Sequence, residues 1–179
     1  MAARTPIMLQ LISLVLLMFS FFIIQTSLPT LPKYVPTHFN AAGVANAWGS
    51  PDIFWVLLGV QALTCVLFLI IPYLGQLSPG AIHVGRRRLK DFPPAQRAHI
   101  LSMLNDMAAY MNIVMNLFFV LMLAQIVRVA AQPIPRIHPL FPMVLLIGGT
   151  FGILLYYTVQ FYTVAKSEHR GGPPDGIAS

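Results

Sequence analysis

Residues 53–74 read IFWVLLGVQALTCVLFLIIPYL and contain no Asp, Glu, Lys, Arg or His. At about 1.5 Å of rise per residue, a helix of this length crosses a hydrocarbon core of about 30 Å. Lipid offers the backbone no hydrogen-bond partner, and the stretch lacks the alternating polarity of a barrel strand. The stretch therefore predicts a membrane-spanning α-helix.

Three further uncharged runs flank this stretch, at residues 7–27, 108–127 and 140–165. The composition agrees, because only 9% of the residues are charged, against about 25% in a soluble domain. We therefore expect an all-α, four-helix transmembrane bundle. It forms a single membrane domain over residues 1–170, with helices at about 7–27, 53–74, 108–128 and 140–165. Residues 171–179 are expected to form a flexible tail.

The first run follows Arg4, as a signal peptide would follow a basic residue. Its apolar stretch is longer than the roughly 7–15 residues of a signal peptide, and no small-residue cleavage site follows it. We therefore favour an uncleaved membrane anchor.

Basic residues predict which way the bundle faces. In a four-span chain both termini and the loop between the second and third helices lie on one side. That side carries most of the 11 Lys and Arg residues, and the other side has only Lys33, Arg128 and Arg136. By the positive-inside rule, both termini face the cytoplasm and residues 28–50 form an outer loop.

The net charge of +6 could also suggest binding to nucleic acid. The soluble segments are too short for a nucleic-acid module, however, and aromatic residues do not interleave the basic ones. Juxtamembrane bases instead attract anionic lipid headgroups. We therefore expect membrane lipids, and not nucleic acid, as partners of Arg86, Arg87, Arg88 and Lys90.

The outer loop has the most distinctive polar pattern, with Thr37, His38 and Asn40 close together. One His without a second ligand nearby does not indicate a metal site, and without an acid it forms no catalytic triad. We expect no catalytic residue, metal or cofactor. The loop is predicted to be either a hydrogen-bonded cap or a ligand- or partner-binding loop. Its candidate residues are Pro36, Thr37, His38, Phe39, Asn40, Gly43 and Trp48.

The same loop resembles a small bacterial membrane-protein family of unknown function that is related to the N-terminal domain of the Sdp immunity proteins. Residues 31–43 match an LP-x-x-[IV]-PTHFN-x-x-G core, and residues 48–50 match the W-G-S that follows it. Residues 44–47 lack the acidic residue usual in the family. The resemblance implies a loop that binds an extracellular peptide or ligand, in a bacterial cytoplasmic membrane.

Three asparagines of the third run, Asn105, Asn112 and Asn116, fall on one face of a helix. An amide exposed to lipid is unfavourable, so this face should meet another helix. It is predicted either to form interhelical hydrogen bonds or to line a path for a polar substrate. The possible partners on the first helix are Gln10, Ser13 and Ser20.

Two other segments each allow two arrangements. In the fourth run Gly148 and Gly152 form a GxxxG pair beside Gly149, which is predicted to pack within the bundle or against another subunit. Residues 94–107 are amphipathic, so they fit an interfacial helix or a straight extension of the third membrane helix.

These features favour a non-catalytic membrane protein that acts by contact. The small size and the absence of an ionisable group deep in any run favour an accessory subunit that packs against a larger membrane complex. The alternative is a sensor or immunity-type protein whose outer loop binds an extracellular peptide or ligand. We do not expect an enzyme or a transporter.

Overall fold

The computed structural model describes residues 4–85 and 87–167. The four long helices are α1 (Arg4–Ser27), α2 (Ile53–Leu77), α3 (Pro94–Val129) and α4 (Leu140–Ser167). Each of them is long and apolar enough to cross a membrane. The predicted four-helix transmembrane bundle is thus confirmed, whereas its orientation stays a prediction. The predicted tail at residues 171–179 lies outside the described residues.

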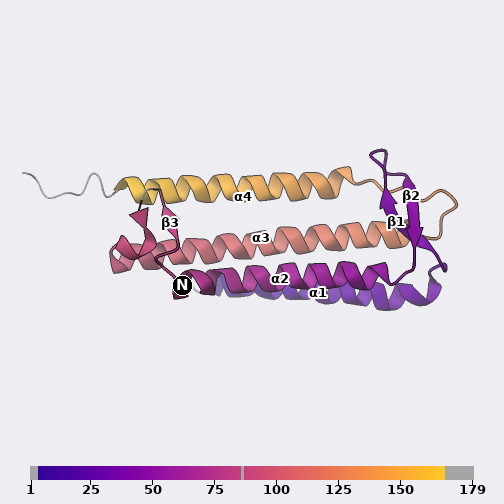
Figure 1. Cartoon of the computed structure of the whole chain (residues 1–179), viewed down its shortest axis with the longest axis horizontal. Coiled ribbons are helices and arrows are strands. Elements are labelled where there is room, and N and C mark those ends of the chain that lie inside the picture. The colour runs from indigo at the N-terminus through magenta and orange to yellow at the C-terminus, as the bar shows by residue number, and fades with distance from the viewer. Residues whose placement is uncertain (1–3, 86, 168–179) are drawn as a thin grey trace, which may run out of the picture.

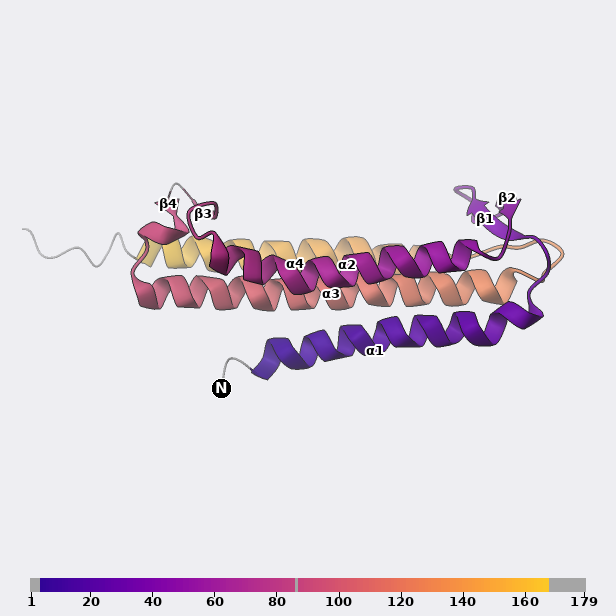
Figure 2. The ribbon, with the colours of Figure 1, turned by 60° about the horizontal axis from the view of Figure 1, so that its bottom comes forward.

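Helix α3 is the centre of the bundle. It packs against each of the other three helices, and α1 also packs against α2. Within the described part of the chain, α4 has no comparable contact with α1 or α2. Figure 1 shows α3 between α4 and the α1–α2 pair, and Figure 2 shows α1 and α4 on opposite sides of α3. Helix α4 is therefore held to the bundle along one side only.

A small antiparallel hairpin lies at each end of the bundle (Figure 1). At one end β1 (Val35–Phe39) pairs with β2 (Ala45–Gly49). At the other end β3 (His83–Val84) pairs with β4 (Arg87–Arg88), and β3 contacts α4. We call these the outer end and the inner end, after the predicted orientation. Two short 3-10 turns complete the fold, at Leu28–Thr30 and Leu89–Asp91.

The outer hairpin is anchored by a buried apolar cluster. Val35 of β1 and Phe54 of α2 are fully buried, and both pack with Ile24 of α1. Leu123 and Ala130 add the end of α3 to the same cluster. Burial of apolar side chains is the main stabilising term in such a contact, so β1 is held against three helix ends.

The amphipathic segment at residues 94–107 is a straight extension of α3, which begins at Pro94 without a break. Ile100 is fully buried, and it packs with Val84, Leu89 and Phe92 of the inner hairpin and the turn after it. The apolar face of this segment therefore packs against protein. This contact explains why the segment continues the membrane helix instead of lying flat on the lipid surface.

The glycine face of α4 contributes to packing within the bundle through one of its three glycines. A Cβ atom at Gly149 would lie 3.2 Å from both methyl groups of Val114, so this glycine permits close approach of α3. Gly148 and Gly152 point elsewhere, because successive helix residues are rotated by about 100°. Among the described residues, a Cβ at either one would meet nothing within 4 Å. The prediction of a GxxxG contact inside the bundle is thus corrected: Gly149 makes the contact.

Candidate functional site

The turn of the outer hairpin is built by Asn40 and Gly43. The Asn40 carboxamide oxygen accepts hydrogen bonds from the backbone amides of Ala42 and Val44, both at 3.0 Å. The Gly43 amide donates to the Asn40 carbonyl at 2.8 Å. Gly43 has a φ of 75°, a conformation that glycine adopts without steric penalty. Asparagine and glycine are therefore the residues that this turn requires.

Gly43 also clamps the hairpin to the loop between α3 and α4. Its carbonyl accepts a hydrogen bond from the Ile137 amide at 2.9 Å, and the Ala45 amide donates to the Pro135 carbonyl at 3.0 Å. A Cβ at position 43 would lie 2.3 Å from the Ile137 carbonyl oxygen. Only glycine lets the two backbones come this close. We call these two hydrogen bonds the hairpin clamp.

The clamped hairpin closes one side of a cavity of about 560 Å³. This volume is within the range of about 300–1,000 Å³ that is typical of ligand pockets. Residues 36–41 of the hairpin form one wall. The helices α2, α3 and α4 and the loop between α3 and α4 supply the rest. The helix residues are largely apolar and include Ile53, Leu57, Met122, Ile126 and Met143. We call this space the outer cavity.

The polar groups of the outer cavity come from β1 and the turn. Thr37, His38 and Asn40 are all exposed and line its hairpin wall. The His38 ring nitrogen Nδ1 is 2.5 Å from the carboxamide oxygen of Asn46. The partner of the His38 ring is therefore an amide.

The structure brings together most of the loop residues predicted from the sequence. Pro36, Thr37, His38, Phe39 and Asn40 all line the outer cavity. Gly43 acts through the hairpin clamp. Trp48 pairs with Pro36 across the hairpin, and 54% of its surface is exposed. Sequence reasoning missed the helix residues of the cavity, since an apolar side chain that lines a pocket cannot be told from one that faces lipid.

The chemical groups that line the outer cavity suit an amphipathic molecule. Within residues 4–85 and 87–167, no group of three or more His, Cys, Asp or Glu residues could hold a metal ion. His38 meets an amide and not an acid, so the pairing that orients a catalytic histidine is not made there. An apolar floor with a polar rim fits a molecule that has an apolar part and a polar part.

A second polar group lies in the middle of the bundle, where amides from three helices form a hydrogen-bonded chain. Gln61 of α2 donates to Asn116 at 3.0 Å, and Asn116 donates to the Asn112 carboxamide at 2.8 Å. Asn112 in turn donates to Gln10 of α1 at 2.6 Å. Gln61, Asn112 and Asn116 are buried. We call these four residues the amide chain; it ties α1, α2 and α3 together and leaves out α4.

The amide chain includes only part of the polar face predicted on α3. Gln10 is a partner, as expected, and Gln61 is an addition that the sequence pattern did not reveal. Asn105 is half-buried and does not belong to the hydrogen-bonded amide chain. Ser13 bonds the Leu9 carbonyl instead, and the buried Ser20 hydroxyl has no partner among the described residues. Two roles were predicted for this face, interhelical hydrogen bonds and a path for a polar substrate. The observed contacts are interhelical hydrogen bonds.

The basic cluster lies around the inner hairpin. Arg87 donates to the Asp91 carbonyl at 2.8 Å, and its guanidinium lies 4.7 Å from the centre of the Phe92 ring. Arg88 and Lys90 are exposed. Arg86 lies outside the described residues. Arg87 is exposed as well, so all three described members of the cluster face the surroundings of the inner end.

One comparison with known proteins finds a match. Residues 14–72 are similar to a domain of unknown function (DUF1648), whose description carries no activity. No curated protein and no solved structure matches the chain. The match shows no link to the Sdp immunity proteins, so that link stays a prediction from the loop residues. The chain is a multi-pass membrane protein in which the outer hairpin and most of α1 and α2 are similar to a domain of unknown function.

Proposed function

We propose that this protein is a non-catalytic membrane protein that acts by contact, and that its outer cavity holds an amphipathic ligand or partner segment. The observation that carries the proposal is the cavity of about 560 Å³ between the outer hairpin and three helix ends. One wall of this cavity is the loop that the sequence predicts to bind a ligand. Its floor is apolar and suits an acyl or aliphatic chain. The membrane is the bacterial cytoplasmic membrane, with both termini inside.

The geometry supports binding in two ways. The hairpin clamp fixes the polar wall, so a ligand would meet a preformed surface and lose less conformational entropy of the protein on binding. The floor contains Met122 and Met143, whose flexible side chains adapt to apolar partners of different shape. Ligand binding in the outer cavity corresponds to the sensor or immunity-type alternative, with an extracellular peptide as one class of ligand.

Site-specific photo-crosslinking in intact cells tests the proposal. A photoreactive residue at Thr37, in the cavity wall, is compared with one at Leu67, which is 50% exposed on α2 and outside the cavity. We expect an adduct at Thr37 that is absent at Leu67. It should be lost in Met143→Trp, which fills the cavity, and kept in Val144→Trp, the neighbouring position outside it. Equal adducts at both positions, or an adduct unaffected by Met143→Trp, would overturn the proposal.

A second function, an accessory subunit of a larger membrane complex, is favoured by the outer face of α4. Gly148 and Gly152 lie there with open space above them, and small residues let another membrane helix approach closely. Gentle detergent extraction followed by native sizing tests this role. We expect a species larger than the 19.8 kDa chain, reduced to the free chain by Gly148→Leu. A free chain in the wild type would contradict it.

A further inference from the structure

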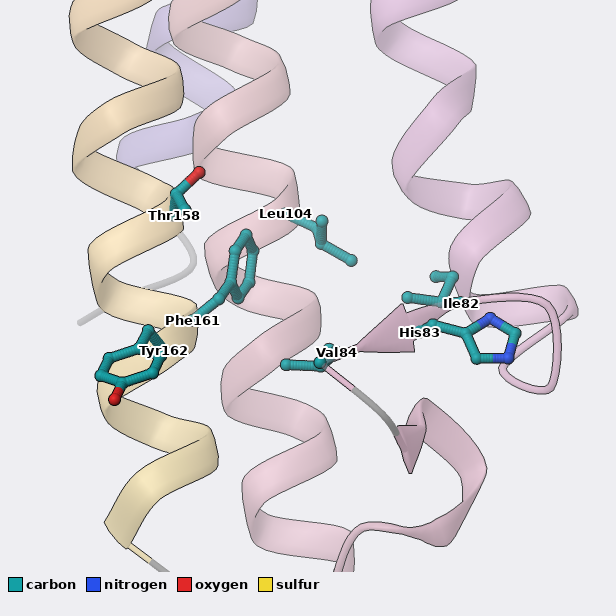
Figure 3. A pocket seen from close by; sticks show the side chains of 8 residues that line it. Ile82, His83, Val84, Leu104, Thr158, Phe161 and Tyr162 are labelled. Carbon is teal, nitrogen blue, oxygen red and sulfur yellow. The ribbon is translucent and has the colours of Figure 1, made fainter.

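A cleft at the inner end, between α2 and α4, takes no part in the proposed function. One cavity of about 600 Å³ lies against α3 there and is lined by residues such as Phe68, Met107 and Leu154. A second cavity of about 340 Å³ lies between β3, α3 and α4 (Figure 3). Ile82 and Leu104 line both cavities, so the two are neighbours that meet at these residues. We call the two together the inner cleft.

The inner cleft is apolar inside and polar at its edge. In Figure 3 the side chains of Leu104, Phe161 and Val84 surround a common space. The hydroxyl of Tyr162 points away from this space on the α4 side, and the ring of His83 lies on the opposite side, next to Ile82. The larger cavity continues this apolar lining between α2 and α4. Its position follows from the architecture, because α4 packs on α3 and makes no comparable contact with α2 in the described residues.

Two cationic side chains flank the edge of the cleft. Arg88 is exposed and pairs across the inner hairpin with His83, which lines the cleft. The Lys166 ammonium lies 6.0 Å from the ring centre of Tyr162, which lines the opposite side. The described acids of this end are fewer than the bases: Asp91 and Asp106 against Arg87, Arg88, Lys90, Arg97 and Lys166. An apolar cleft with a cationic edge is complementary to an anionic phospholipid.

We propose that the inner cleft binds one anionic phospholipid. An acyl chain lies between α2 and α4, and the phosphate lies between Arg88 and Lys166. The lipid fills the space where α4 lacks a protein neighbour and thereby joins α4 to α2. This role is independent of the outer cavity, which lies at the opposite end of the bundle.

Native mass spectrometry tests the proposal on the purified full chain. The protein is reconstituted with equal amounts of phosphatidylglycerol and phosphatidylcholine, and the retained lipid is identified. We expect one phosphatidylglycerol per chain. The Arg88→Gln/Lys166→Gln variant should retain it about thirtyfold less, since each base contributes roughly 1 kcal/mol and the two together about 2 kcal/mol. The matched variant Lys33→Gln/Arg128→Gln changes two bases at the other end and should behave as the wild type.

A second pair of variants tests the apolar part without changing charge. Leu154 is 44% exposed and lines the cleft, so Leu154→Trp fills it without crowding a packed core. Leu155 is 55% exposed and does not line it, so Leu155→Trp is the control. We expect Leu154→Trp alone to displace the lipid. Three results would overturn the proposal. They are equal retention of both lipids, unchanged retention of phosphatidylglycerol in both test variants, and a wild-type protein that is a lipid-free dimer.

Discussion

Replacing Gly43 with alanine should open the hairpin clamp. Position 43 has a φ of 75°, and the new Cβ would lie 2.3 Å from the Ile137 carbonyl oxygen. Real Cβ atoms essentially never come closer than 3.0 Å to another heavy atom. The turn must therefore move by about 0.7 Å or more to reach the shortest ordinary contact. Such a shift lengthens both clamp hydrogen bonds, at present 2.9 and 3.0 Å.

The size of the effect has two parts. The left-handed conformation costs an alanine about 1–2 kcal/mol, and each lost hydrogen bond about 1 kcal/mol. Gly43→Ala should therefore destabilise the outer end by about 3–4 kcal/mol. Gly85→Ala is a matched control, because Gly85 has a φ of 63° and a Cβ there would meet nothing within 4 Å in the described chain. Gly85→Ala should therefore lose only the conformational part, about 1–2 kcal/mol.

Hydrogen exchange of the purified protein in detergent measures the difference. In Gly43→Ala the amides of Ala45 and Ile137 should exchange at least about tenfold faster, because exchange reports the local opening free energy. In Gly85→Ala both amides should keep their wild-type rates. If the two variants gave the same exchange at Ala45 and Ile137, the clamp would not be what Gly43 provides.

Three other substitutions or reactions test the bundle. Asn116→Leu should lower the free energy of unfolding by about 1–3 kcal/mol in a denaturant titration, since Gln61 and Asn112 lose a partner; Asn105→Leu should change it little, and equal effects would refute the amide chain. Gly149→Leu should lower the thermal stability in detergent because the new Cβ alone would lie 3.2 Å from the methyl groups of Val114, whereas Gly148→Leu should not. Equal losses would contradict the packing of α4. The thiol of the fully buried Cys65 should react with a membrane-permeant maleimide only after unfolding, and rapid reaction of the folded protein would count against the helix arrangement.

The four membrane helices could be predicted because lipid imposes a strong rule on sequence. Each uncharged run marks a helix, and the structure changes mainly the ends. The sequence could not decide how α3 begins, because an interfacial helix and a straight extension of the membrane helix share one amphipathic pattern. The decision came from Ile100, whose burial against the inner hairpin is a tertiary contact that no local pattern contains.

The candidate site was predictable where polar residues are rare. Thr37, His38 and Asn40 stood out in the outer loop, and all three line the outer cavity. The floor was not predictable, since Met122 and Met143 look like any other apolar residue of a membrane helix. Gln61 is an intermediate case: one amide in an apolar run signals a partner, but only the packing of α2 on α3 identifies it as Asn116.

The proposed function depends most on the outer hairpin facing away from the cytoplasm, and cysteine labelling measures this directly. In a Cys65→Ser background, Ala42→Cys places a thiol at the exposed turn, and Lys90→Cys places one at the exposed inner end. Intact cells are treated with a membrane-impermeant maleimide. We expect labelling at position 42 at once and at position 90 only after the membrane is permeabilised. The reverse order would contradict this orientation.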